Sequence, residues 1–139
     1  MPTNSAVDVD ASWPDAPATH VAMTLPPASV ARAVAALARR DGELEVLVTV
    51  RRPDGLLIVS ATTGGCVGSF QPHPDADWTQ LVGDVHREPA DEVEVVLGGQ
   101  LVTWPRRHLA PDAAGRHAVQ RFGSSGPPLP GTWERPPHR

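Results

Sequence analysis

The chain has 139 residues, which is enough for one domain with a buried core and too few for two ordinary domains. No apolar run approaches the roughly 20 residues that a membrane-spanning helix needs, and no basic segment leads into an apolar one as in a signal peptide. The net charge is −4, and the single cysteine, Cys66, excludes a disulfide within the chain. We therefore expect a cytoplasmic protein without a membrane partner.

The first 18 residues differ in composition from the rest of the chain. They have no hydrophobic period and are rich in Pro, Asp, Ser and Ala, so residues 1–18 are expected to form a disordered lead-in. We expect one domain over residues 19–134 and a frayed tail over residues 135–139. Within this domain, residues 20–25 alternate and predict a short strand.

A helix is predicted over residues 28–40. Val30, Val34 and Leu37 recur at helical spacing, and Asp41-Gly42 ends the pattern. The prolines that precede the helix are tolerated in its first turn, because a proline lacks only an N–H that would be unpaired there.

Three strands are predicted next, over residues 44–51, 56–61 and 66–71. The first is rich in β-branched residues and alternates, and the turn at Pro53-Asp54-Gly55 joins it to the second. Because the connections are too short for a parallel crossover, we expect the three strands to pair antiparallel in sequence order.

The second half of the chain predicts a hairpin and a helix. Residues 78–86 are ambiguous, with a strand slightly favoured. The alternating residues 92–97 and 100–104 flank Gly98-Gly99 and predict a hairpin. Residues 109–122 predict a second helix that Gly123 would cap.

Sequential strands with helices at both ends predict an α+β domain. We expect an antiparallel sheet of about five to six strands, built from a meander and a hairpin, with two helices packed on it. The residues expected in the core are Val30, Val34, Leu37, Val46, Val48, Ile58, Val96, Trp104, Val119 and Phe122.

The charge distribution is asymmetric. Residues 41–94 carry eleven acidic side chains against three arginines, whereas residues 95–139 carry two acidic side chains against six arginines. The acidic middle argues against nucleic acid as a partner, because phosphates would be repelled, and favours a partner with a basic surface. An ordinary solvated acidic surface is the alternative interpretation. The candidate partner-binding residues are Asp75, Asp77, Trp78, Asp84, Glu88, Asp91 and Glu92.

Catalytic and metal-binding patterns are weak. No two histidines have the close spacing of a zinc site, and His73, Asp75 and Asp77 read as a solvated loop. Cys66 follows Gly64-Gly65 at the start of a strand, where a small buried hydrophobic residue is the better interpretation than a nucleophile. We therefore expect no enzyme activity, no cofactor and no metal. An enzyme would need a pocket that brings Cys66 or Asp75 next to a histidine.

The C-terminal third carries a family resemblance. The strand, the helix with its alanines and the Gly-, Pro- and Trp-containing tail resemble the Imm-one family of immunity proteins, at Pro111, Ala113, Ala114, Ala118, Val119, Phe122, Gly126, Pro128, Pro130 and Trp133. The resemblance implies a non-catalytic, cytoplasmic α+β protein that binds and occludes a cognate antibacterial toxin domain, of the deaminase or nuclease type. A small-ligand or peptide-binding regulatory module without catalysis is the alternative.

Overall fold

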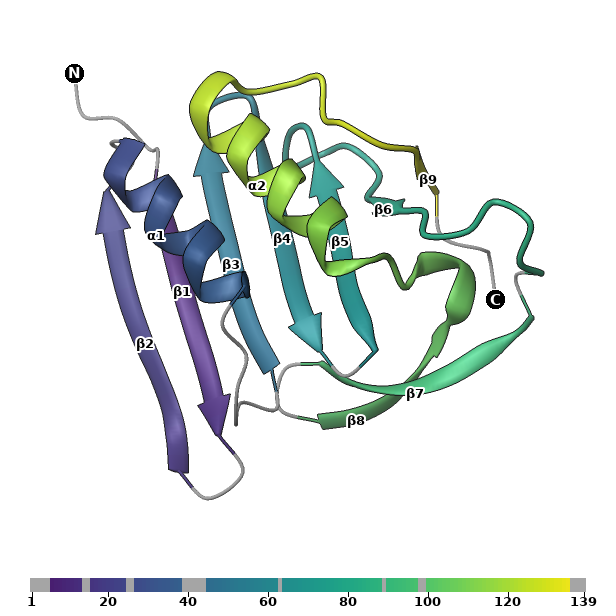
Figure 1. Ribbon diagram of the computed structural model, residues 1–139. Helices are drawn as coiled ribbons and strands as arrows, with labels where there is room; N and C mark the ends of the chain where they lie inside the picture. Colours follow the sequence, from purple (N-terminus) through teal and green to yellow (C-terminus); the bar gives the residue numbers. More distant parts are fainter. Residues whose placement is uncertain are drawn as a thin grey trace.

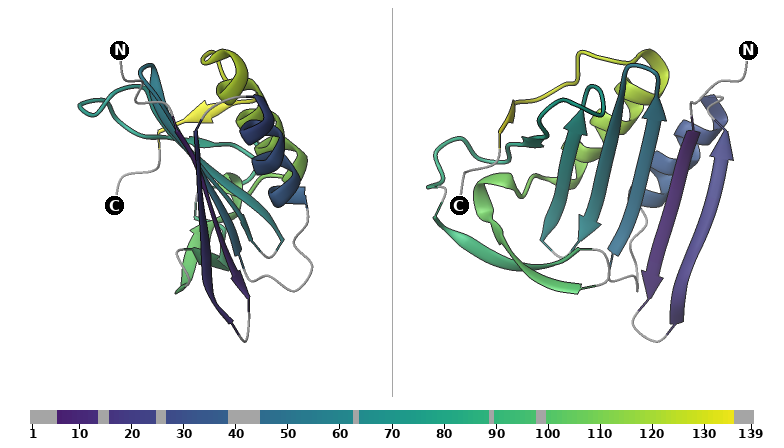
Figure 2. Two further views of the ribbon diagram at one scale, coloured as in Figure 1. Left: turned by 90° about the vertical axis from the view of Figure 1, so that its left-hand side faces the viewer. Right: turned by 180° about the vertical axis from the view of Figure 1, so that it is seen from behind.

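The fold has two layers, a sheet and a pair of helices. The computed structural model describes residues 6–13, 16–24, 27–38, 45–62, 64–88, 90–97 and 100–135. A seven-stranded sheet has the order β2-β1-β3-β4-β5-β6-β9, and two helices lie side by side on one of its faces (Figures 1 and 2). A separate two-stranded sheet pairs β7 with β8. This arrangement confirms the predicted α+β class with an antiparallel sheet and two packed helices.

The elements follow one another along the chain as strands interrupted by the two helices. Their bounds are β1 Ala6–Trp13, β2 Ala16–Thr24, α1 Pro27–Ala38, β3 Glu45–Arg52, β4 Gly55–Thr62, β5 Gly65–Gln71, β6 Thr79–Leu81, β7 Glu92–Leu97, β8 Gln100–Pro105, the 3₁₀ helix η1 Arg106–His108, α2 Asp112–Ser125 and β9 Trp133–Glu134.

The central meander agrees with the sequence prediction. β3, β4 and β5 pair antiparallel in sequence order, with Val48 opposite Val59 and Val59 opposite Gly68. The predicted β7–β8 hairpin is also confirmed, with Val95 opposite Val102. The Gly98-Gly99 turn of this hairpin lies outside the described residues, as do residues 136–139 of the predicted tail.

The N-terminal prediction is wrong for the described part of residues 1–18. β1 pairs antiparallel with both β2 and β3, and Val7 lies opposite Val50 with no exposed surface. Asp and Ala lower the local strand propensity, but Val7 and Val9 alternate with Asp8 and Asp10, which is a strand pattern that the prediction from composition overlooked. β1 pairs with β3, which spans Glu45–Arg52 and is distant in the sequence. This pairing supplies backbone hydrogen bonds that a local pattern does not reveal.

The two helices pack on the sheet and on each other. α1 buries Val30 and Leu37, and α2 buries Val119 and Phe122. Leu37, Val119 and Phe122 belong to one buried cluster with the valines of β3 and β4. Gly123 of α2 lies on Val30, because a Cβ there would come 2.7 Å from the Val30 Cγ2 atom. The predicted end of the second helix at Gly123 is wrong, because Gly123 lies inside α2.

α2 continues to Ser125 and ends at Gly126. The residue after the helix, Gly126, has a φ of +72° and donates its backbone N–H to the carbonyl of Phe122. A glycine suits this position because other residues rarely adopt a positive φ.

Four of the ten predicted core residues are only half-buried. They are Val34, Ile58, Val96 and Trp104. Ile58 pairs with Thr49, so it faces away from the helices, while its neighbours Leu57 and Val59 face them. A continuous apolar run such as that of β4 does not indicate which face of the strand is buried, because both faces carry apolar residues.

Only a short part of residues 78–86 forms the strand that the sequence slightly favoured. β6 has three residues, and the chain then leaves the sheet as a loop. Two-residue β9 completes the sheet beside β6, with Trp133 opposite Leu81. This last pairing joins the C-terminal end of the described chain to the region that carries the predicted acidic residues.

Candidate functional site

The predicted partner-binding residues lie in two loops and at the start of one strand. Asp75 and Asp77 belong to the loop between β5 and β6, and Trp78 follows them immediately before β6. Asp84, Glu88 and Asp91 belong to the loop between β6 and β7, and Glu92 begins β7. We call residues 73–94 the acidic segment. It contains seven carboxylates and one arginine, Arg87.

The loop between β5 and β6 is held by a side chain of the sheet. The Gln71 side-chain amide donates to the carbonyls of Pro74, at 3.2 Å, and Ala76, at 2.9 Å. Asp75 and Asp77 are exposed on this loop, and Asp77 lies 3.2 Å from Arg135. Trp78 is half-buried, so it is neither a full core residue nor a freely exposed anchor.

The loop between β6 and β7 carries its own ion pairs. Asp84 accepts a hydrogen bond from the backbone N–H of His86 at 2.9 Å, which stabilises the turn. Arg87 lies 2.9 Å from Asp91, and Arg106 contacts the other oxygen of the same carboxylate at 3.3 Å. Asp84 and Asp91 therefore have structural partners, whereas the described structure gives Glu88 no ion pair.

A cluster of Arg107, His108 and Glu134 fixes this region to β9. Arg107 binds both oxygens of Glu134, at 2.5 and 2.9 Å, and the buried His108 ring lies 2.7 Å from the same carboxylate through Nε2. The hydrogen bonds from Arg107 and then His108 lower the pKa of Glu134 to about 2. Glu134 in turn raises the pKa of Arg107.

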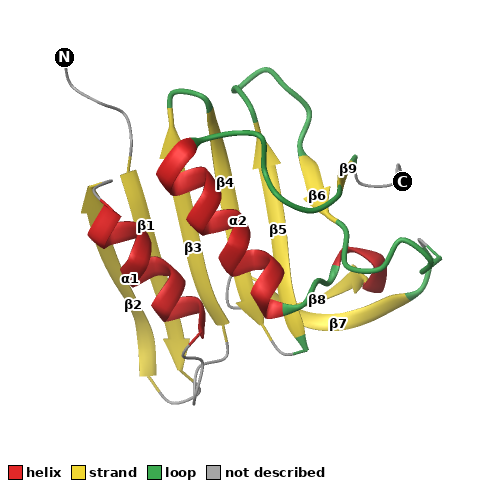
Figure 3. Cartoon of the chain, turned by 45° about the horizontal axis from the view of Figure 1, so that its top comes forward, coloured by secondary structure: helices red, strands yellow, loops and turns green. Residues whose placement is uncertain are grey.

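The same arginine also reaches the acidic segment. Arg107 donates to the backbone carbonyls of Val85 and Arg87, and its own carbonyl accepts from the N–H of Gly83 at 2.7 Å. Arg135, which follows Glu134 in the chain, contacts Asp77 in the other acidic loop. Both acidic loops are therefore bound to the end of the sheet where β9 lies (Figure 3). The sequence offered no sign of this cluster, because Glu134 is 26 residues from His108.

The β7–β8 hairpin continues the acidic segment with a different surface. Residues opposite each other in an antiparallel pair share a face, so Glu92, Glu94 and Thr103 lie on one face of the hairpin together with Val96 and Leu101. Four of these five residues are exposed, and Leu101 has 66 % of its surface accessible. We call these five residues the outer hairpin face.

The opposite face of the hairpin packs toward the body of the protein. Val95 is buried, and the backbone N–H of Val96 donates to the hydroxyl of Thr62 at the end of β4. Trp104 donates its indole N–H to the carbonyl of His108 at 3.2 Å. These contacts hold the hairpin across the ends of the central strands, as Figure 1 shows.

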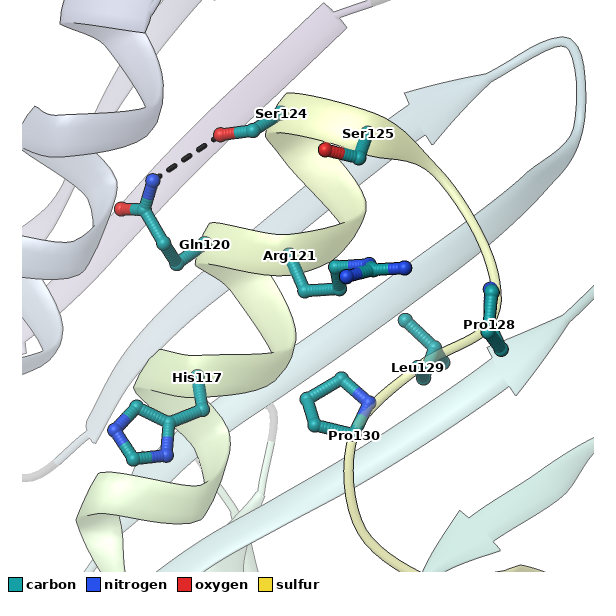
Figure 4. A pocket seen from close by; sticks show the side chains of 8 residues that line it. All are labelled: His117, Gln120, Arg121, Ser124, Ser125, Pro128, Leu129 and Pro130. Atoms are coloured by element: carbon teal, nitrogen blue, oxygen red, sulfur yellow. Dashed lines mark hydrogen bonds between the residues drawn. The ribbon is translucent and has the colours of Figure 1, made fainter.

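A hollow of about 640 Å³ lies between α2 and residues 128–130. In Figure 4, Arg121 extends from α2 toward Pro128 and Leu129, and Gln120 turns away to hydrogen-bond Ser124 at 3.1 Å. His117 lies one turn earlier on the same helix. The lining offers one arginine and one histidine above proline and leucine side chains, which is a surface for a weakly held ligand or peptide.

The described residues do not assemble an evident metal centre. Among them, no three His, Cys, Asp or Glu side chains are grouped as a metal site requires, and no helix is long and apolar enough to span a membrane. Cys66 is buried, as predicted, with its sulfur 3.4 Å from the carbonyl of Pro111. Comparisons of the chain with protein-family models, with curated proteins and with solved structures find no match.

Proposed function

We propose that this protein is a cytoplasmic immunity protein of the Imm-one type, which binds and occludes a cognate antibacterial toxin domain without catalysis of its own. The observation that carries the proposal is the acidic segment, where seven carboxylates face one arginine within 22 residues of chain. The resemblance of the C-terminal third to that family supplies the class of partner.

The charge of the acidic segment and the fixed position of its loops both support this function. A toxin domain that acts on nucleic acid, such as a deaminase or a nuclease, needs a basic cleft to hold phosphates. Carboxylates presented by an inhibitor would occupy the same cleft and accelerate association through complementary charge. The Arg107 cluster supports this role, because it fixes the loop that carries Glu88 before any partner binds.

The ion pairs of the acidic segment decide which residues give a clean test. Asp77, Asp84 and Asp91 contact arginines, so their replacement would also remove ion pairs within this protein. Asp75, Glu88 and Glu94 are exposed and have no ion pair within the described residues. The triple variant Asp75→Asn, Glu88→Gln, Glu94→Gln therefore removes three charges with little expected effect on stability.

The experiment measures association of this protein with the toxin domain encoded beside its gene, by stopped-flow kinetics at low and high salt. We expect the triple variant to associate about 10-fold more slowly at low salt, with a weaker salt dependence, because rim charges govern on-rates. The matched control adds three positive charges on the exposed side of α2, through Ala113→Lys, Gln120→Lys and Ser124→Lys, and should leave the on-rate within about 2-fold of wild type.

Two results would contradict the proposal. If wild type neither binds the toxin domain nor protects a bacterial host that expresses it, the immunity function is wrong. If wild type binds but the triple variant keeps the same on-rate and salt dependence, the acidic segment is a solvated surface and the contact lies elsewhere.

The hollow beside α2 favours the second candidate, a small-ligand or peptide-binding regulatory module. Its open shape and its apolar floor at Leu129 suit a ligand that contributes little buried charge. Native mass spectrometry of the purified protein would detect a retained metabolite or peptide. Displacement of that ligand by Leu129→Arg, with the exposed Gln100→Arg as control, would favour this candidate over the first.

A further inference from the structure

We propose that Leu101 is the apolar anchor of the toxin interface, and that the partner offers an apolar recess beside its basic cleft. This inference rests on the proposed function and specifies where on this protein the toxin domain sits. The site is the outer hairpin face, which adjoins the acidic segment through β7.

The exposure of Leu101 is the first argument. Of the large hydrophobic side chains whose exposure the structure describes, which leaves out residues 8–27 among others, Leu101 is the most exposed, at 66 %, and Val85 follows at 52 %. Leu101 projects from a paired strand, whereas Val85 lies in a loop. Leu101 lies opposite Val96, which is half-buried, so the two form a small apolar patch on a fixed backbone.

The surroundings of this patch are the second argument. Glu94 lies two residues along β7 from Val96 on the same face, and Glu92 lies two residues further. Residues 92–104 contain these two carboxylates and neither arginine nor histidine. An apolar centre with an acidic border fits a partner whose apolar recess is bordered by lysine or arginine, and it would repel a second acidic surface.

The position of the hairpin is the third argument. Its inner face is fixed through Val95, Trp104 and the hydrogen bond to Thr62, so the outer face is held in one orientation. Figures 2 and 3 show β7 running from the loop between β6 and β7 across the ends of the central strands, so the outer hairpin face continues from that loop. A single basic domain would therefore contact Leu101 and the acidic segment together.

The test compares the affinity of single variants for the toxin domain that wild type binds. Leu101→Ala should raise Kd about 30-fold, chiefly through faster dissociation, because truncation of an anchor leaves its recess unfilled. Leu101→Met should retain an affinity within about 3-fold of wild type, since it keeps the apolar volume. Pro130→Ala is the matched control for an exposed apolar side chain outside both the hairpin and the acidic segment, and it should change Kd by less than about 3-fold.

The outcomes separate this inference from the proposed function. Wild-type binding with an unchanged Kd for Leu101→Ala would overturn the anchor and leave the immunity function standing. Failure of wild type to bind or protect would overturn both. The outer hairpin face could also bind a second copy of this chain, and sedimentation of this protein alone tests that case. A wild-type dimer that Leu101→Ala converts to a monomer would refute the inference. Equal urea midpoints for wild type and the Leu101 variants establish that folding is intact.

Discussion

Replacement of Glu134 by glutamine tests whether the Arg107 cluster holds the C-terminal end of the sheet. The variant keeps the size of the side chain and removes the charge that binds Arg107 at 2.5 and 2.9 Å and the buried His108 at 2.7 Å. We expect a lower free energy of unfolding at neutral pH, because the cluster joins β9 to the residues that follow β8.

The magnitude follows from the pKa of Glu134. A lowering from 4.5 to about 2 corresponds to at most about 3 kcal/mol of stabilisation by the charged form. About 32 % of the side chain is exposed, and solvent weakens its ion pair, so we expect a loss of about 1 to 2 kcal/mol. The folded state binds a proton less readily than the unfolded state, so this contribution is complete above about pH 5 and disappears as the pH falls toward 2.

The assay is urea denaturation followed by tryptophan fluorescence, at several pH values from 7 to 3. Wild type and Glu134→Gln should differ most at pH 7 and converge as the pH falls below about 5. Asp77→Asn is the matched control, because its ion pair with Arg135 is exposed at both ends, and it should cost less than about 0.5 kcal/mol. A difference for Glu134→Gln that is absent at pH 7, or that stays constant down to pH 3, would refute the role of the charged cluster.

Three further variants test the packing, each by the same denaturation measurement. Phe122→Ala removes a fully buried ring and should cost about 3 to 5 kcal/mol, whereas a loss below about 1 kcal/mol would mean that the ring is not in the core. Trp104→Ala should cost about 2 kcal/mol, because the indole is half-buried and donates to the carbonyl of His108, and a loss as large as that of Phe122→Ala would contradict this position. Gly115→Ala should destabilise by about 1 to 2 kcal/mol despite the better helix propensity of alanine, since its methyl group would come 2.7 Å from the Cys66 sulfur, and a stabilised variant would show that α2 moves freely away from the sheet.

Local patterns in the sequence were sufficient to predict those elements whose apolar residues recur at the spacing of a helix or a strand. The meander of β3, β4 and β5 follows from alternation and from connections too short for a crossover, and its antiparallel order is confirmed. α1 follows from the helical spacing of Val30 and Leu37, which are both buried. The burial of Cys66 follows from its place at the start of an apolar strand.

Tertiary contacts decided the rest, because they join residues that no local pattern connects. β1 has an alternating pattern of its own, but only its pairing with β3 places it in the sheet beside that strand. The buried face of β4 depends on its register with β3, so Ile58, which was expected in the core, is only half-buried. The acidic residues were visible in the sequence, but the sequence did not separate Asp77, Asp84 and Asp91, which contact arginines, from Glu94. Leu101 and Glu94 share a face only because β7 and β8 pair in this register, and Glu134 reaches His108 only because β9 joins the sheet beside β6.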